Sequence, residues 1–169
     1  MNLDLSGQIA LVTGASRGIG QAVADELVKC GAKVIGTATT AEGAKAIDQK
    51  LKPSGGAGLA LNVTAPNACE EIIDHIVKEF GGINILVNNA GITRDNLAMR
   101  MKSEEWTDVI DTNLSAVFRL SQAVLRPMIF PVFIVGSRAK GRLPLAKLSA
   151  FKFVKFAPLT AGNLALLSS

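Results

Sequence analysis

Three glycines lie in the stretch TGASRGIG at residues 13–20, directly after the apolar run IALV. If a strand turns into a helix here, Gly14 can take a positive φ, Gly18 lets a pyrophosphate approach, and Gly20 lets the helix pack closely on the sheet. The start of that helix would offer free N–H groups and the positive end of its dipole to a phosphate. The spacing is GxxxGxG, and in the first strand-to-helix turn of an α/β chain it predicts a dinucleotide site.

The residues after the second predicted strand indicate which dinucleotide this site would take. A site for NAD places Asp or Glu about 20 residues after the glycines, where the carboxylate holds the ribose hydroxyls. Here the sequence reads Thr-Ala-Thr-Thr at 37–40, and Arg17 lies in the glycine loop. A carboxylate would repel a 2′-phosphate, whereas hydroxyls and a guanidinium bind one. We therefore predict NADP(H) rather than NAD(H); the alternative is that Arg17 is a solvated loop residue.

The elements that must position this loop alternate between strand and helix over the first 125 residues. Short apolar runs predict strands, and apolar residues three or four apart predict helices. The predicted strands are 9–12, 33–39, 59–63 and 83–91, and the predicted helices are 18–29, 42–52 and 68–80. Strand and helix in alternation, with short connections, indicate an α/β fold, a Rossmann-like doubly wound parallel sheet covered on both faces.

A long helix is predicted next, from an N-cap at Ser103 to about residue 128. Its apolar stripe comprises Trp106, Ile110, Leu114, Val117, Leu120 and Val124. Asn113 lies beside this stripe, where a side-chain amide needs partners. The pattern changes after Met128, and a fifth strand at 129–137 would contain Pro131, which cannot donate to a central ladder. We therefore divide the chain into a nucleotide-binding Rossmann domain at 1–128 and a divergent or incomplete continuation of it at 129–169.

Composition argues against several other classes of protein. All 14 acidic residues lie at or before Asp111, and seven basic residues lie from Arg126 onward. Such a basic segment can indicate contact with nucleic acid or a membrane, but the regular periodicity is lost in the same part of the chain, so we predict neither partner. No apolar stretch is long enough to span a membrane and no signal core opens the chain, so a cytoplasmic protein is expected. One histidine, His75, and two cysteines without ligand spacing predict no metal site.

The motifs TGASRGIG, LNV, NNAG and TNL occur in this order, and together they resemble the short-chain dehydrogenase/reductase family. The stretch NNAGITRDNLAMRMKSEEW further resembles the branch of this family that reduces 3-oxoacyl thioesters in bacterial fatty-acid synthesis. The resemblance covers residues 7 to about 128. It implies a Rossmann fold, a homotetramer, and hydride transfer from NADPH to the ketone of a 3-oxoacyl group carried by acyl carrier protein.

The resemblance also implies roles for particular residues. The pyrophosphate and its ribose would be held by Gly14, Ser16, Arg17, Gly18, Ile19 and Gly20. Thr39 would lie near the 2′-phosphate, and Asn62 and Val63 would flank the adenine. Asn89, Ala90 and Gly91 would line the nicotinamide ribose. Asn113 would be the helix amide of the catalytic tetrad, which holds a water in the proton relay; the alternative is a core amide with satisfied hydrogen bonds.

The sequence departs from the family where the proton donor is expected. The family uses a Tyr in a Tyr-x-x-x-Lys motif, in which the Lys lowers the phenol pKa. This chain contains no Tyr. Ser137 matches the family's catalytic Ser by context, although it comes several residues early. Phe151 and Lys155 have the Tyr-to-Lys spacing, but Phe has no hydroxyl and chance explains the match as well.

Three interpretations of residues 129–169 follow from this departure. The segment belongs to a damaged or frame-shifted product, to an incomplete or misassigned sequence of a normal reductase, or to a variant that binds nucleotide without catalysis. The loss of acidic residues and of periodicity, together with Pro131, favours the first two. The sequence thus predicts an NADPH-dependent 3-oxoacyl reductase, with a catalytically impaired nucleotide-binding homologue as the alternative.

Overall fold

The computed structural model describes residues 3–129 of the chain. Its strands are β1 (Ile9–Val12), β2 (Lys33–Ala38), β3 (Ala57–Ala60) and β4 (Ile85–Val87). Its helices are α1 (Gly18–Lys29), α2 (Ala41–Leu51), α3 (Ala68–Phe80), α4 (Ser103–Ile110) and α5 (Ala116–Ile129), with a short 3-10 turn η1 (Lys52–Ser54) and a π turn η2 (Asp111–Ser115).

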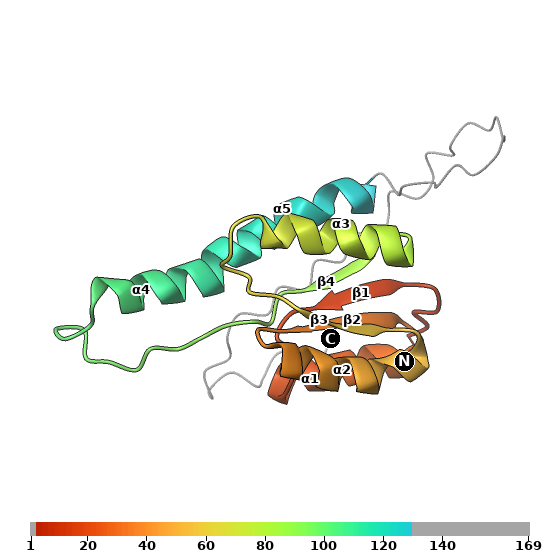
Figure 1. Ribbon diagram of the computed structural model, residues 1–169, viewed down its shortest axis with the longest axis horizontal. Helices are drawn as coiled ribbons and strands as arrows, with labels where there is room; N and C mark the ends of the chain where they lie inside the picture. The colour runs from red at the N-terminus through yellow and green to blue at the C-terminus, as the bar shows by residue number, and fades with distance from the viewer. Residues whose placement is uncertain (1–2, 130–169) are drawn as a thin grey trace, which may run out of the picture.

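The four strands form one parallel sheet in the order β3-β2-β1-β4. The helices α1 and α2 cover one face of this sheet, and α3 and α5 cover the other (Figure 1). The predicted Rossmann-like parallel sheet is therefore confirmed for the described residues. Since the chain adds β2 and β3 on one side of β1 and then returns to add β4 on the other side, the topology reverses between β1 and β4.

The core consists of two apolar layers, one on each face of the sheet. The side chain of Leu11 joins the layer under α3 and α5, while those of Ala10 and Val12 join the layer under α1 and α2. This alternation follows from the two-residue period of a strand. Both faces of β1 are therefore buried, which is why the predicted strand reads as an uninterrupted apolar run.

The helices predicted at 18–29 and 68–80 are confirmed with these bounds as α1 and α3. Gly31 and Gly81 lie just after the ends of these helices, and both have a φ of +90°, the left-handed conformation typical of a helix end. The helix predicted at 42–52 is α2, displaced by one residue at each end. Strong apolar periodicity and a terminal glycine thus predicted these elements correctly.

The bounds of the strand predicted at 59–63 are wrong, because β3 begins at Ala57 and ends at Ala60. A Cβ on Gly58 would overlap the backbone of α2, so only glycine lets the helix lie directly on the strand here. The Gly58 N–H donates to Asp48 Oδ1 at 3.1 Å. The strand ends before Asn62, whose Oδ1 accepts from the N–H of Thr64 at 3.1 Å and closes a turn.

The single helix predicted at 103–128 is interrupted by the π turn η2, and its last residue is Ile129. The expected N-cap at Ser103 is also wrong, since Lys102 is the N-cap. Its backbone N–H donates to Oε2 of Glu105 at 2.9 Å, which is the glutamate half of a capping box.

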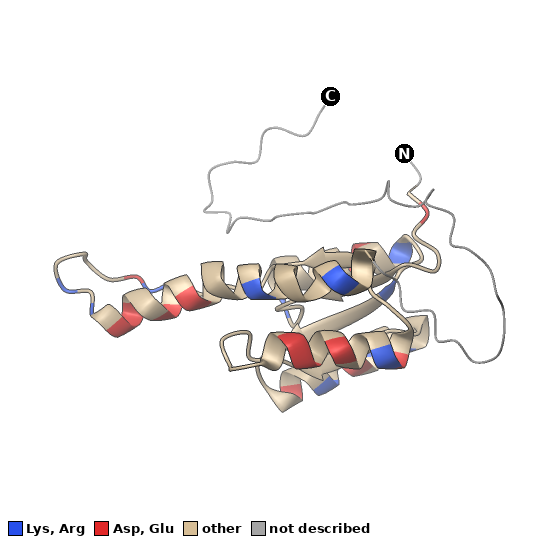
Figure 2. Ribbon diagram, turned by 90° about the horizontal axis from the view of Figure 1, so that it is seen from above, with Lys and Arg blue, Asp and Glu red and all other residues tan. Residues whose placement is uncertain are grey.

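The predicted apolar stripe of this helix is divided between the core and the surface. Leu120 and Val124 are buried against the sheet, whereas Trp106 and Leu114 each keep 60% of their surface exposed. The reason is that α4 continues the line of α5 beyond the end of the sheet, where the described residues offer it no apolar layer (Figures 1 and 2). The stripe therefore predicts an apolar face correctly but not what covers it.

The two cysteines, Cys30 and Cys69, differ in burial. Cys69 is 1% exposed and Cys30 is only half-buried. Burial raises the pKa of the Cys69 thiol, and the positive charge of Arg119 opposes this only in part.

We expect Cys30 to react with Ellman's reagent in the native protein and Cys69 only at the rate of unfolding. One fast phase that consumes both thiols would contradict this assignment, and labelling in denaturant gives the reference of two thiols.

No helix among residues 3–129 combines the length and the apolar character needed to cross a membrane.

Some predictions fall outside the described residues. They are the strand over most of 129–137, the catalytic Ser137, the spacing of Phe151 to Lys155, and the character of the segment 129–169 after its first residue. The division of the chain near residue 128 stays a prediction.

Candidate cofactor site

The predicted site residues converge at the carboxyl ends of β1 and β4. In open α/β sheets, ligands bind in the crevice where the strand order reverses, and here that point lies between these two strands. The glycine loop at 13–20 follows β1, and the polar loop at 88–92 follows β4. Two motifs that are some 70 residues apart in the sequence therefore meet at the edge where this fold binds nucleotides.

The glycine loop has the backbone that the sequence predicts. Gly14 and Gly18 have φ angles of +66° and +60°. A Cβ added to Gly18 would meet nothing within 4 Å, so this position faces open space. A Cβ added to Gly20 would overlap the carbonyl oxygen of Gly14 and the Asn89 side chain, which makes glycine obligatory there. Gly18 therefore lies on the open side of the loop, and Gly20 lies on the side that packs against the neighbouring residues.

The start of α1 fits a pyrophosphate. Its N-cap, Arg17, makes no side-chain capping bond, and the first turn of the helix carries no acidic residue. Ser16, Arg17 and Ile19 are exposed around it. Free backbone donors, an exposed guanidinium and the positive end of the helix dipole all favour an anion here.

Asn89 fastens the glycine loop from the neighbouring strand. Its Nδ2 donates to the carbonyl oxygens of Thr13 and Gly14, each at 3.0 Å. Thr13 is 1% exposed, and its hydroxyl accepts from the N–H groups of Asn89 and Ala90 at 3.0 Å and donates to the Val87 carbonyl at 3.3 Å. The two loops are therefore joined by a network of five side-chain hydrogen bonds that spans β1 and β4.

Asn113 lies in the π turn and clasps the end of the polar loop. Its Oδ1 accepts from the Ile92 N–H at 2.9 Å, and its Nδ2 donates to the Ile92 carbonyl at 2.9 Å. A Cβ added to Gly91 would come within 3.1 Å of Asn113 Oδ1. The amide therefore has the satisfied hydrogen bonds that the sequence offered as one alternative, and it also lies directly beside the predicted nicotinamide end of the site.

The residues predicted for the adenosine end lie along the same edge of the sheet. Thr39 is exposed immediately after β2, while Thr40 caps α2 by accepting from the Gly43 N–H at 3.1 Å. Asn62 is exposed after β3, and Val63 is buried beneath it. Of the described residues, Thr39 and Arg17 are thus the polar candidates for a 2′-phosphate.

The structure brings together all twelve residues predicted for the cofactor at one edge, together with Asn113, whereas the predicted catalytic Ser137 lies outside the described residues. Thr13 is not among the predicted site residues, although its hydroxyl makes three of the bonds that join the loops. A hydroxyl at the end of an otherwise apolar buried strand was the available signal, because a buried hydroxyl needs partners.

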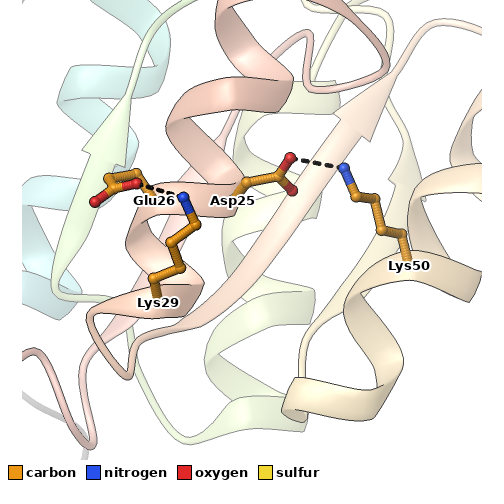
Figure 3. A network of polar contacts seen from close by, with 4 residues as sticks. All are labelled: Asp25, Glu26, Lys29 and Lys50. Atoms are coloured by element: carbon orange, nitrogen blue, oxygen red, sulfur yellow. Dashed lines mark hydrogen bonds and ion pairs between the residues drawn. The ribbon is translucent and has the colours of Figure 1, made fainter.

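A cavity of about 180 Å³ lies behind the glycine loop, between α1 and α2. The loop residues Ala15 and Ser16 contribute to its wall, and Ile47 and Leu51 of α2 contribute to its apolar lining. Asp25 of α1 and Lys50 of α2 also line it and form an ion pair of 2.7 Å, beside a separate pair of Glu26 and Lys29 (Figure 3). Ser16 lies both on the wall of this cavity and on the exposed side of the loop.

Comparison with known proteins identifies the class to which this fold and site belong. The family model of the short chain dehydrogenases matches residues 8–143, which is most of the chain. The chain belongs to the short-chain dehydrogenase/reductase family, a family of oxidoreductases. A crystal structure from Sinorhizobium meliloti 1021, described as a short-chain alcohol dehydrogenase, aligns with a TM-score of 0.68 and 38% identity over 73% of this chain and 50% of that one.

Among the most similar curated relatives are bacterial 3-oxoacyl-[acyl-carrier-protein] reductases named FabG. The proteins of Escherichia coli K12 and Salmonella typhimurium are each 61% identical over 127 residues, 75% of this chain and 52% of theirs. The Pseudomonas aeruginosa protein is 56% identical over 128 residues, again 75% of this chain and 52% of its own length. The chain thus spans about half the length of the curated relatives it matches.

Proposed function

We propose that this chain carries the cofactor-binding half of a ketoreductase that uses NADPH to reduce 3-oxoacyl-[acyl-carrier-protein] to the 3-hydroxyacyl form. The observation that carries the proposal is the glycine loop, fastened to the polar loop after β4 by Asn89 and Thr13, in a chain 61% identical to reductases of that name. Acyl carrier protein bearing a 3-oxoacyl thioester is the proposed partner, and the cytoplasm is the proposed compartment.

The exposed groups of the site support NADPH as the cofactor. Backbone donors at Gly18, Ile19 and Gly20 would hold the pyrophosphate, and Arg17 with Thr39 would hold the 2′-phosphate. The adenine would lie between residues 62–63 and the loop. When bound, the reduced nicotinamide supplies the hydride for the ketone. Asn89, Ala90 and Gly91 would orient its ribose, and the clasp of Asn113 on Ile92 keeps that loop in place.

Reduction of a ketone also needs a proton for the developing alkoxide. General acid catalysis by a positioned side chain contributes about 10²- to 10⁴-fold to such a step. The family supplies the proton from a Tyr, and this sequence contains none. We propose Ser137 as the group that polarises the carbonyl and Asn113 as part of the proton relay. Without a phenol, this chain is expected to bind NADPH far better than it turns it over.

The exposed apolar face of α4 and α5 supports a homo-oligomer, which we propose is the tetramer. Its large side chains are Trp106, Leu114, Phe118, Leu125 and Ile129, each at least 38% exposed. Several large apolar side chains exposed along α4, the π turn η2 and α5 are typical of protein–protein contact. The helix α4 also carries acidic residues, including Glu104 and Glu105 in its first turn (Figure 2).

The proposal is tested by titrating the 169-residue chain with NADPH and with NADH, and by assaying turnover of a 3-oxoacyl thioester. We expect fluorescence to report NADPH binding at least about tenfold tighter than NADH, since Arg17 and Thr39 gain a phosphate partner. Turnover is expected about 10²-fold or more below that of an intact family member, because the acid is missing. A turnover within about tenfold of that enzyme would contradict the role given to the missing Tyr.

The second candidate is a nucleotide-binding protein without reductase activity. The absence of Tyr from all 169 residues favours it. It predicts NADPH binding with no oxidation of NADPH in the presence of the thioester. The absence of NADPH binding, with the folded state verified by circular dichroism, would count against both candidates.

A further inference from the structure

Gly36 lies in the middle of β2, directly beneath the glycine loop. A Cβ at this position would come within 2.7 Å of Ile47 Cγ2, 3.0 Å of Ala15 Cβ and 3.3 Å of Leu51 Cδ1. Two of these neighbours belong to α2, and the third belongs to the loop itself. Because Gly36 has no side chain, both α2 and the glycine loop can pack closely against β2 at this position.

Ala15 is held at this depth by the sheet. Its backbone N–H donates to the carbonyl of Thr37, the residue after Gly36, at 2.8 Å. Ala15 is 4% exposed, so its methyl group rests in the layer between the sheet and the helices. Ser16 and Arg17 follow Ala15 directly in the chain. The distance of Ala15 from β2 therefore determines the positions of these two residues.

The neighbours of Gly36 differ in how they can yield to a larger residue. Ala15, Ile47 and Leu51 all line the cavity between α1 and α2, but only Ile47 and Leu51 have side-chain rotamers with which to turn into it. Ala15 has no rotamer to change. It can yield only by lifting its backbone, which stretches the hydrogen bond to Thr37 and displaces Ser16 and Arg17.

From this geometry we infer that Gly36 is a positioning residue for the cofactor: it sets the depth of the glycine loop and so the aim of Ser16 and Arg17 at the phosphates. The inference rests on the proposed function for its ligand, NADPH. Gly36 itself touches no part of the open face of the loop, and it acts through Ala15.

The test is Gly36→Ala, measured by NADPH affinity and by exchange of the Ala15 amide hydrogen. A Cβ only 3.0 Å from Ala15 Cβ requires the loop to move by a few tenths of an ångström, and we expect this shift to weaken NADPH binding about tenfold. Exchange at Ala15 is expected to rise in the protein without cofactor. This second readout does not depend on NADPH binding, so it separates failure of the inference from failure of the proposed function.

Two rescue variants identify the contact that matters. Adding Ala15→Gly to Gly36→Ala removes the loop methyl and is expected to restore affinity. Adding Ile47→Leu removes the branched methyl of α2 and is expected to restore thermal stability but not affinity. Ile73→Ala, in the apolar layer on the other face, lowers stability without touching the loop and is expected to leave affinity unchanged.

Ala15→Ser keeps β2 unchanged and enlarges the loop partner, so it replaces Gly36→Ala if that variant does not fold. A weaker Kd with faster Ala15 exchange, reversed by Ala15→Gly but not by Ile47→Leu, supports the inference. Unchanged affinity and unchanged exchange in Gly36→Ala would overturn it. Rescue of affinity by Ile47→Leu would overturn it as well, because α2 rather than the loop would then be the element displaced.

Discussion

Replacing Thr13 by valine is expected to lower the free energy of unfolding by about 2–5 kcal/mol and to remove NADPH binding. The two side chains have nearly the same shape, but valine accepts no hydrogen bond. The part-buried N–H groups of Asn89 and Ala90 would lose their acceptor; an unpaired donor costs about 1–3 kcal/mol when fully buried, so these two together cost less than twice the upper value. Urea denaturation followed by circular dichroism measures the change.

Two further variants make the Thr13 experiment specific. Thr13→Ser keeps the hydroxyl and is expected to retain most of the stability and the affinity. Thr37→Val makes the same change at an equally buried position of β2 and controls for the loss of any buried hydroxyl. A Thr13→Val protein within about 0.5 kcal/mol of the wild type would show that the network contributes nothing measurable.

Gly20→Ala is expected to have the largest effect on the cofactor site itself. The new methyl group would overlap the Gly14 carbonyl and the Asn89 amide, so the loop and α1 cannot both keep their places. Overpacking of this kind costs about 1–3 kcal/mol. If that cost falls on the loop that binds the cofactor, we expect NADPH affinity to fall up to about a hundredfold. Thermal unfolding and fluorescence titration measure the two effects.

Gly82→Ala is the matched control for this substitution. A Cβ there meets nothing within 4 Å, and Gly82 does not have a positive φ. We expect its stability to stay within about 0.5 kcal/mol of the wild type and its NADPH affinity to stay unchanged. If Gly20→Ala behaved like this control, the close packing of α1 on the loop would not be a requirement of the site.

The elements that were predicted best are those whose sequence signal is local and strong. The helix α3 has an apolar stripe and a terminal glycine, and β1 is an apolar run bounded by polar residues. The π turn was not predictable in this way, because Asp111–Ser115 has no composition that sets it apart from a helix. It contains Asn113, whose two bonds go to Ile92, 21 residues earlier in the chain.

In the candidate site too, the features with a local sequence signal were predicted, and those that depend on tertiary neighbours were not. The glycines, the missing carboxylate after β2 and the NNAG stretch indicated a nucleotide edge, and the structure places these residues at one edge. The role of Thr13 and the depth set by Gly36 depend on which residues of β2 and β4 lie beside the loop. Such neighbours follow from strand order and register, which a single sequence does not specify by its period. The predicted catalytic Ser137 lies outside the described residues.

The bonds from Asn89 to Thr13 and Gly14 have a consequence for how this site comes into being during synthesis. They join residues 75 or 76 positions apart, so a growing chain contains TGASRGIG long before Asn89 has been synthesised. Contacts of such sequence separation form late, after the intervening chain has been ordered. We therefore expect the chain to bind nucleotide only after it has folded as far as β4. The glycine motif alone does not form the site.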